Sequence, residues 1–243
     1  MSILVTVGLP ARGKSYISQK LKRSLKWIGY NVRVFNAGEW RRNNYNLTTN
    51  GDGLNETFFN KDSIGFRDQI AIECFNELLS WLAISDNRAV AIFDATNTTV
   101  ERRALLIDMV QSRYKLIFIE SIVDNQDVVD ANISMKQYSP DYIGKKKEDV
   151  VNDFKIRLEH YESVYQTITK NEGIPYIKTI NVSDEIKLYN VKGMFENDLI
   201  FFMNNIIITR PTIYLTRHGQ SEYNVKELLG GDSSITELGK NYA

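Results

Sequence analysis

The octet GLPARGKS, at residues 8–15, constrains the fold of this chain more than any other segment. It satisfies the pattern GxxxxGKS, and it lies between a β-branched run, residues 3–7, and a stretch in which apolar residues recur at helical spacing. In that setting the glycines let the backbone turn tightly and aim its N–H groups at an anion, to which the following helix adds its positive N-terminal dipole. The octet therefore predicts a phosphate-binding loop between a buried strand and a helix.

Apolar runs and amphipathic stretches alternate along most of the chain. We expect strands at residues 3–7, 32–35, 89–93, 115–120 and 174–180, and helices at residues 17–28, 70–84, 101–112, 126–136 and 148–170. Strands that alternate with helices are typical of an α/β fold, here a three-layer domain with a mainly parallel sheet covered on both faces. Residues 43–65 are rich in asparagine, threonine and glycine without periodicity, which is typical of a lid, a binding loop or a disordered segment.

The composition limits the partners of the protein. Lys and Arg number 30, as do Asp and Glu, so the net charge of the 243-residue chain is zero. No global field then attracts it to nucleic acid or to an anionic membrane, and any attraction to anions is local. The single cysteine, Cys74, excludes an internal disulfide and a cysteine-based metal site, and it favours a reducing compartment. Since the sequence shows no secretory leader and no apolar run long enough to span a bilayer, we expect a cytoplasmic protein.

Three residues at the predicted sheet edge have the chemistry of a nucleotide site. Lys14 can supply positive charge to the β- and γ-phosphates, and the hydroxyl of Ser15 can bind Mg²⁺. A loop of this kind also needs an acidic group beside the metal, and Asp94 follows the buried run 89–93. An aspartate there could instead cap a helix, but residues 96–99, TNTT, follow it at the edge where α/β sheets bind ligands. The pattern predicts ATP and Mg²⁺ as cofactors, with Ser15 and Asp94 as metal ligands.

A second motif, LTRHGQSEYN at residues 215–224, follows a strand predicted at residues 212–216. Its RHG core is similar to that of the histidine-phosphatase (phosphoglycerate-mutase-like) superfamily, in which a neutral imidazole attacks phosphorus and the adjacent arginine stabilises the phosphoryl oxygens. That superfamily also needs a second histidine and an acidic proton donor. The other histidine, His160, falls on the predicted helix 148–170, where an ordinary surface role is the simpler interpretation. We therefore expect no phosphatase activity from this chain.

Six strings make a resemblance specific, and they occur in the order VGLPARGKSYISQKL, FNAGEWRR, FDATNTTVERR, SPDYIG, RLEHYE and IYLTRHGQSEYN. Together they closely resemble the bifunctional 6-phosphofructo-2-kinase/fructose-2,6-bisphosphatase family, over nearly the whole chain. The resemblance implies that residues 1–209 form a P-loop NTPase-like kinase domain. It implies that residues 210–243, which begin at the turn of Arg210 and Pro211, are a truncated N-terminal piece of the histidine-phosphatase domain. It also suggests a homodimer.

The resemblance implies the reaction and the nucleotide site. MgATP would be the phosphoryl donor and fructose 6-phosphate the acceptor, phosphorylated on its 2-hydroxyl to give fructose 2,6-bisphosphate, a regulator of glycolysis. Asp94 would lie at the reacting centre, with Asn132 at the nucleotide and Lys136 near the transferring phosphoryl group. The sequence leaves open whether Asp94 takes the hydroxyl proton or orders the metal's water. The loop residues that would hold ATP are Gly8, Leu9, Pro10, Ala11, Arg12, Gly13, Lys14, Ser15 and Tyr16.

The resemblance likewise implies a pocket for the acceptor. Its residues would be Arg41, Arg67, Thr96, Arg102, Lys136, Arg157 and Tyr161. A sugar phosphate is a dianion, which the planar fork of arginine binds with two parallel charge-assisted hydrogen bonds. Taken singly, each arginine has a solvated surface role as its simpler interpretation. Arg157 and Tyr161 are four residues apart and so share a helix face.

In the second motif the family pattern assigns the nucleophile to His218. Arg217, Asn224 and Gly230 would contact the bisphosphate. One position departs from the family, because Val123 stands where many members have a cysteine. That difference argues against an indispensable thiol at this position.

Two other functions fit parts of the sequence. A P-loop kinase could use another acceptor, such as a nucleotide or a polynucleotide end, although the zero net charge and the lack of a basic and aromatic stripe count against a polymer. A nucleotide-responsive binding module could retain both motifs without turnover, although intact Lys14, Ser15 and Asp94 oppose this. Product analysis with MgATP and fructose 6-phosphate separates the three.

Overall fold

The computed structural model describes residues 1–44, 64–135, 138–142, 146–182, 184–206 and 212–242. The chain divides into two compact units, Met1–Ile207 and Ile208–Ala243. The turn at Arg210 and Pro211, where the sequence predicts a domain boundary, lies outside the described residues. Within the described residues, no helix combines the length and the apolar composition needed to cross a bilayer.

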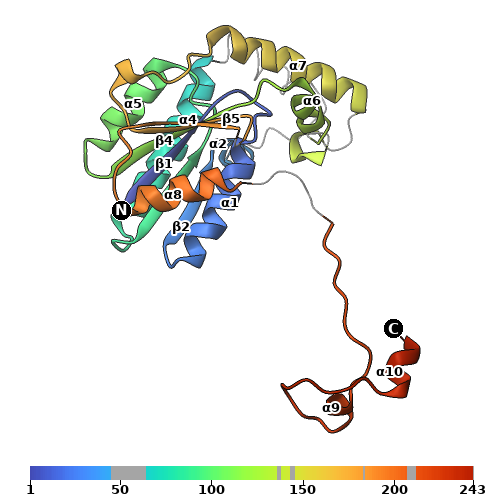
Figure 1. Cartoon of the computed structure of the whole chain (residues 1–243). Coiled ribbons are helices and arrows are strands. Elements are labelled where there is room, and N and C mark those ends of the chain that lie inside the picture. Colours follow the sequence, from blue (N-terminus) through green and yellow to red (C-terminus); the bar gives the residue numbers. More distant parts are fainter. Residues whose placement is uncertain (45–63, 136–137, 143–145, 183, 207–211, 243) are drawn as a thin grey trace. The chain divides into compact units, whose positions relative to one another are not determined.

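A six-stranded sheet forms the centre of the first unit (Figure 1). Its order is β2-β3-β1-β4-β5-β6, and the strands are parallel except for the last, which is antiparallel to β5. The central strands β1 and β3 are continuous apolar runs, as parallel strands covered on both faces require. The predicted mainly parallel sheet is confirmed. The strands are β1 (Ser2–Val7), β2 (Asn31–Asn36), β3 (Ala89–Asp94), β4 (Lys115–Ile122), β5 (Tyr176–Ile180) and β6 (Glu185–Tyr189).

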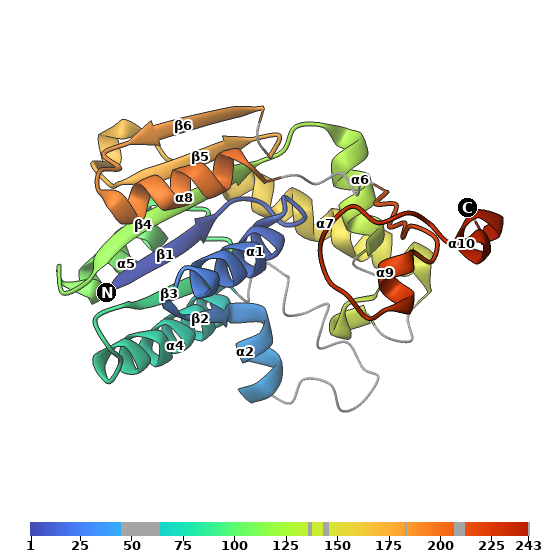
Figure 2. The same cartoon turned by 60° about the horizontal axis from the view of Figure 1, so that its bottom comes forward.

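Helices cover both faces of this sheet (Figure 2). On one face, α1 and α8 form an apolar core that includes Leu4, Leu21 and Leu199. On the other, α4 and α5 form a core that includes Ile3 and Phe75. Ile3 and Leu4 serve different cores because successive side chains of a strand point to opposite faces. The helices of this unit are α1 (Lys14–Trp27), α2 (Ala37–Asn44), α4 (Ile64–Ala83), α5 (Val100–Val110), α6 (Gln126–Met135), α7 (Lys147–Val164) and α8 (Met194–Asn204), with short 3-10 turns at Pro140–Tyr142 and Lys170–Glu172.

A third apolar core connects the β1–α1 loop to α6 and α7. Ala11 of the loop, Val123 after β4, Ile133 of α6 and Phe154 of α7 belong to it. Val123 is 4% exposed, so its side chain serves packing beside the loop. This core places α6 and α7 at the carboxyl edge of the sheet, beside the ends of β1 and β4.

The predicted helix 148–170 is wrong at its end, because α7 stops at Val164 and Tyr165 is extended (φ −71°, ψ 128°). Glu120, fully buried in β4, accepts hydrogen bonds from the hydroxyl of Tyr165 (2.5 Å) and the backbone N–H of Ile168 (3.1 Å). These bonds to the sheet replace the bonds of a further helical turn, so tertiary structure overrides the local pattern.

Helix α2 and strand β6 lack a signal in the sequence pattern. The predicted loop 43–65 begins within the end of α2, and α4 begins at Ile64; residues 45–63 lie outside the described residues. The edge strand β6 is largely exposed and carries charged residues, so it lacks the apolar run by which the other strands are predicted.

The second unit contains α9 (Glu222–Val225) and α10 (Glu237–Tyr242), with one isolated β-bridge between Ser221 and Ile235. The strand predicted at residues 212–216 is wrong. In the described part of this unit no strand pairs with that segment, and Ile213 and Leu215 are 77% and 94% exposed. A strand needs a hydrogen-bonded neighbour, which the segment lacks here.

Candidate functional site

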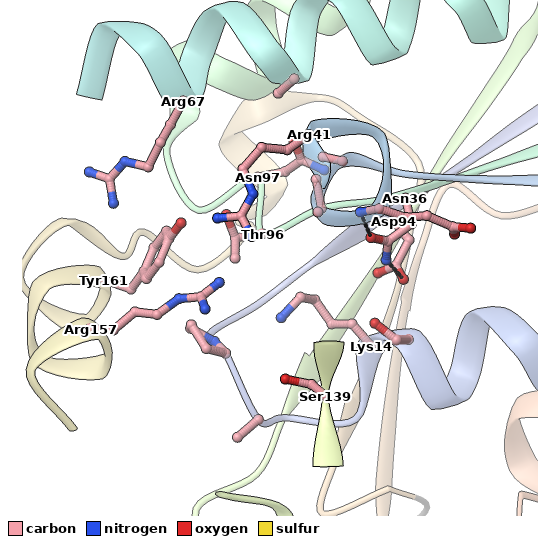
Figure 3. A pocket seen from close by; sticks show the side chains of 18 of the residues that line it. Lys14, Asn36, Arg41, Arg67, Asp94, Thr96, Asn97, Ser139, Arg157 and Tyr161 are labelled. Carbon is pink, nitrogen blue, oxygen red and sulfur yellow. Dashed lines mark hydrogen bonds between the residues drawn. The ribbon is translucent and has the colours of Figure 1, made fainter. Parts of the chain in front are cut away.

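A cavity of about 770 Å³ lies at the carboxyl edge of the sheet in the first unit, the edge where open α/β sheets bind ligands. We call its lining residues in the β1–α1 loop, in the first turn of α1, at the end of β3 and in the β3–α5 turn the loop wall. Its lining residues in α2, α4, α5 and α7 are the helix wall. Figure 3 shows Lys14 and Asp94 on one side of the cavity, and Arg67, Arg157 and Tyr161 on the other.

The β1–α1 loop is fixed at its first glycine. The backbone N–H of Gly8 donates to the carbonyl of Thr96 (2.9 Å), which joins the loop to the β3–α5 turn. A Cβ atom on Gly8 would lie 2.5 Å from the carbonyl oxygen of Ser121, and the φ angle of Gly8 is 139°. Glycine alone satisfies both conditions. At the other end of the loop, Gly13 adopts the left-handed conformation (φ 81°) and starts α1.

Lys14 and Ser15 follow this turn on the loop wall. The side chain of Lys14 points into the cavity in Figure 3, and its Nζ donates to the carbonyl of Leu9 (2.6 Å). Lys14 is 8% exposed, whereas Ser15 is exposed. The lysine is thus folded over the loop, where it can reach a phosphate held by the loop's N–H groups.

Six of the nine loop residues predicted to hold ATP line the cavity, namely Pro10, Ala11, Gly13, Lys14, Ser15 and Tyr16. Arg12 instead forms an ion pair with Glu162 of α7 (3.6 Å). Burial lowers the pKa of Arg12, and the negative charge of Glu162 acts in the opposite direction and raises it. Asn132, predicted to touch the nucleotide, lines the cavity and donates to the carbonyl of Ala11 (2.9 Å). The loop is therefore tied to both α6 and α7.

Asp94 ends β3 with its side chain in the cavity wall, 4% exposed. The β2–β3 register pairs Asn36 directly with Asp94, and the amide of Asn36 donates to its carboxylate (2.6 Å). The hydroxyl of Thr6 approaches the other carboxylate oxygen at 3.5 Å. Asn36 is not among the residues predicted from the sequence, although its place after the apolar run 32–35 is the same signal that identifies Asp94.

The β3–α5 turn completes the loop wall. Asn97 adopts a left-handed conformation (φ 45°), and its amide donates to the carbonyl of Thr6 (2.8 Å). The hydroxyl of Thr99 caps α5 by accepting from the backbone N–H of Arg102 (3.2 Å). Thr96, predicted to bind the acceptor, lines the cavity immediately before these anchored positions.

The oxygen donors of the loop wall suit Mg²⁺. The hydroxyl of Ser15 and the carboxylate of Asp94 both line the cavity, and both are hard ligands. Over the described ranges, His, Cys, Asp and Glu form no group of three or more that could hold a metal ion. Mg²⁺ is commonly bound by one or two carboxylates together with phosphates and water, so the donor set fits this ion.

Four arginines from four helices form the helix wall. Arg41 of α2, Arg67 of α4, Arg102 of α5 and Arg157 of α7 all line the cavity. Arg41 is only 4% exposed, so it is not a solvated surface residue. Figure 3 shows Arg41 and Arg157 with their guanidinium groups on the side of the cavity where Thr96 lies. The structure thus gathers a local positive charge in a chain whose net charge is zero.

Arg102 is engaged by a carboxylate in this state of the protein. Its Nη2 contacts Asp68 of α4 in an ion pair, and its Nη1 donates to the carbonyl of the same residue (3.4 Å). Burial lowers the pKa of Arg102, and the nearby Tyr161 acts to raise it. Asp68, which lines the cavity, therefore competes with any anion for this arginine.

His160 is not an ordinary surface histidine, and that prediction is wrong. It lines the cavity, and its Nε2 lies 2.7 Å from Nη2 of Arg67. The Arg67 guanidinium also lies 5.4 Å from the centre of the Tyr161 ring. The helical spacing places His160 beside Tyr161 and three residues after Arg157, but the apolar stripe of α7 gives no sign that it faces a ligand.

Several predicted site residues lie elsewhere. Lys136 is outside the described residues. In the second unit, Arg217 and His218 are exposed, and Nδ1 of His218 lies 2.6 Å from the carbonyl of Gly219. Ser221 caps α9: its backbone N–H donates to the Asn224 side chain (3.0 Å), and its hydroxyl accepts from the backbone N–H of Asn224 (3.2 Å). Gly230 is exposed and has a φ angle of 78°.

Comparison with known proteins assigns the first unit to a family. Residues 1–210 match the family model for 6-phosphofructo-2-kinase. A 6-phosphofructo-2-kinase/fructose-2,6-bisphosphatase of Caenorhabditis elegans is 42% identical over 250 residues, which cover 100% of this chain and 54% of that protein. The 6-phosphofructo-2-kinase/fructose-2,6-bisphosphatase 1 of Bos taurus is 40% identical over 249 residues, which cover 100% of this chain and 51% of that protein. The chain spans about half the length of these curated relatives.

A solved structure supports the fold. The crystal structure of Chaetomium thermophilum Kti12 in complex with ADP-AlF3 aligns with a TM-score of 0.50 and 12% identity, covering 75% of this chain and 91% of that chain. Together with the sheet order and the family match, this confirms the predicted P-loop kinase-like α/β fold. The chain belongs to the 6-phosphofructo-2-kinase family.

Proposed function

We propose that the protein transfers the γ-phosphoryl group of ATP to the 2-hydroxyl of fructose 6-phosphate and so forms fructose 2,6-bisphosphate. One observation carries this proposal. A single cavity is lined by a phosphate-binding loop with Lys14 and Asp94 and by four arginines from the surrounding helices. A donor nucleotide and an anionic acceptor therefore fit opposite each other, as an in-line phosphoryl transfer requires.

The loop wall supports the role of nucleotide site. The backbone N–H groups of residues 11–15, at the end of the loop and the start of α1, would bind the ATP phosphates, and Lys14 would stabilise charge on the transferring group. Ser15 and Asp94 would hold Mg²⁺, which supplies charge neutralisation at the phosphates. Asn36 donates to the Asp94 carboxylate and so keeps it aimed into the cavity.

The helix wall supports the role of acceptor site. Arg41, Arg67 and Arg157 would bind the 6-phosphate dianion through charge-assisted hydrogen bonds, and the burial of Arg41 and the half-burial of the other two strengthen such bonds relative to those in water. The hydroxyls of Thr96 and Tyr161 would orient the sugar. Catalysis would then rest on holding the 2-hydroxyl in line with the γ-phosphorus, and Asp94 would either accept the hydroxyl proton or order the metal's water.

Product analysis of the 243-residue chain with MgATP and fructose 6-phosphate tests this function. We expect fructose 2,6-bisphosphate from the wild type. Lys14→Met should lower kcat about 10³-fold, because the substitution removes a positive charge that stabilises the transition state. Lys26→Met, at the exposed end of the same helix, is the matched control and should keep full activity. Near-normal turnover by Lys14→Met would exclude the nucleotide site. ATP binding without product would favour a binding module, and phosphate transfer to another compound a different kinase.

We further propose that residues 1–209 are the kinase domain and that residues 210–243 are the start of a histidine-phosphatase domain, without activity in this chain. The support is the RHG motif with an exposed His218 in a unit whose described helices are four and six residues long. Steady phosphate release from fructose 2,6-bisphosphate would contradict this.

The substrates, a nucleotide and a sugar phosphate, favour a cytoplasmic location. The family resemblance suggests a homodimer, which sedimentation velocity of the purified chain tests directly.

A further inference from the structure

The contact between Arg67 of α4 and His160 of α7 joins two helices across the helix wall. The distance from Nη2 to Nε2 is 2.7 Å. A guanidinium group carries donors only and stays protonated, so Nε2 must accept this hydrogen bond. His160 is therefore neutral in this contact, with its proton on Nδ1.

Arg67, which lines the cavity, also has a donor that no group in the described part of the chain satisfies. Its Nη1 is buried, and among the described residues it has no hydrogen-bond partner. A buried donor on a charged group without a partner is costly, and the cost is recovered when an anion binds. Tyr161 covers the same guanidinium with its ring at 5.4 Å, and its ring lies 5.9 Å from that of His160. His160 and Tyr161 together fix the plane of the Arg67 guanidinium group.

We propose that His160 is a positioning residue for the acceptor, and this rests on the proposed function. By accepting from Nη2, the neutral imidazole holds Arg67 so that Nη1 can donate to the phosphate of the sugar. Arginine is a long side chain that loses rotamer freedom when it is ordered, so an acceptor that holds it in advance lowers the cost of binding the phosphate.

Two substitutions at position 160 test this role. His160→Leu removes the acceptor and keeps a side chain of moderate size, whereas His160→Gln retains an acceptor oxygen at the reach of Nε2. We expect His160→Leu to raise the Kd and KM for fructose 6-phosphate about tenfold, with a much smaller change in kcat and in the KM for ATP. His160→Gln should restore both values to within about threefold of the wild type.

A double-mutant cycle with Arg67→Ala shows whether His160 acts through Arg67. In the Arg67→Ala background, His160→Leu should have no further effect on the Kd for fructose 6-phosphate, measured by calorimetry. Independent, additive effects of the two substitutions would overturn the proposal, as would an unchanged Kd for His160→Leu. Because the Kd needs no turnover, the cycle still decides the role of His160 if the wild type binds fructose 6-phosphate but makes no product, a result that would reject the proposed reaction alone.

Discussion

The loop wall and the helix wall of the cavity are fixed by different means. On the loop wall, the reactive side chains follow strand ends, and contacts with the backbone hold them in place. Gly8 donates to the carbonyl of Thr96, and Asn97 donates to the carbonyl of Thr6. The register of the parallel strands therefore determines this wall.

On the helix wall, each arginine comes from a different helix, and pairs of side chains decide where it points. Arg67 is held by His160 and Arg102 by Asp68. Both pairs are contacts between side chains, whereas the bonds of the loop wall end on backbone carbonyls. We infer that changes in the loop wall affect stability and turnover together, and that changes in the helix wall mainly affect affinity for the acceptor.

Glu120 lies in neither wall, but it fixes a helix of the helix wall to the sheet, because it binds the segment that follows α7. Replacing it tests most strongly how far the helix wall depends on the sheet. It is fully buried, it pairs with Lys178 (2.9 Å), and it accepts from Tyr165 and Ile168. Glu120→Gln leaves the ammonium group of Lys178 uncompensated in the interior. We expect a loss of about 3 kcal/mol in the free energy of unfolding, measured by urea denaturation.

The double variant Glu120→Gln with Lys178→Met is the control for this prediction. It removes both charges, so it should be more stable than the sum of the single losses predicts. A loss in the double variant equal to the sum of the two single losses would mean that the hydrogen bonds to Tyr165 and Ile168 matter and the ion pair does not.

Gly8→Ala tests the rigidity of the loop wall. The added Cβ would lie 2.5 Å from the carbonyl oxygen of Ser121, so the loop must move. We expect a loss of about 2 kcal/mol in the free energy of unfolding and a large fall in kcat/KM for ATP. Gly65→Ala is the matched control, because nothing lies within 4 Å of a Cβ there and the residue is in a helix. It should be neutral or slightly stabilising. Normal ATP kinetics for Gly8→Ala would contradict the backbone-determined wall.

The same contrast explains what the sequence predicts and what it does not. Lys14 and Asp94 are predictable because a strand end in a parallel sheet has a known place. Glu120 ends an apolar run in the same way, yet nothing in the sequence shows that residues 165–168 leave the helix to bind it. The partners His160 and Asp68 are likewise missed, since helical spacing gives the face of a residue but not the side chain on the facing helix.

The smallest expected effect concerns Asp68, whose carboxylate holds Arg102 and lies in the wall that would receive a dianion. Asp68→Asn releases the guanidinium group and removes a negative charge, so both consequences favour the acceptor. The pair is half-exposed on the side of Asp68, which limits the gain, and we expect the KM for fructose 6-phosphate to fall about two- to threefold at unchanged kcat. Asp108→Asn, exposed on the same helix as Arg102 and outside the cavity, makes the same change in net charge and should leave this KM unaltered. A rise in KM for Asp68→Asn would show instead that the ion pair holds Arg102 in its binding position, and the helix wall would then be as preorganised as the loop wall.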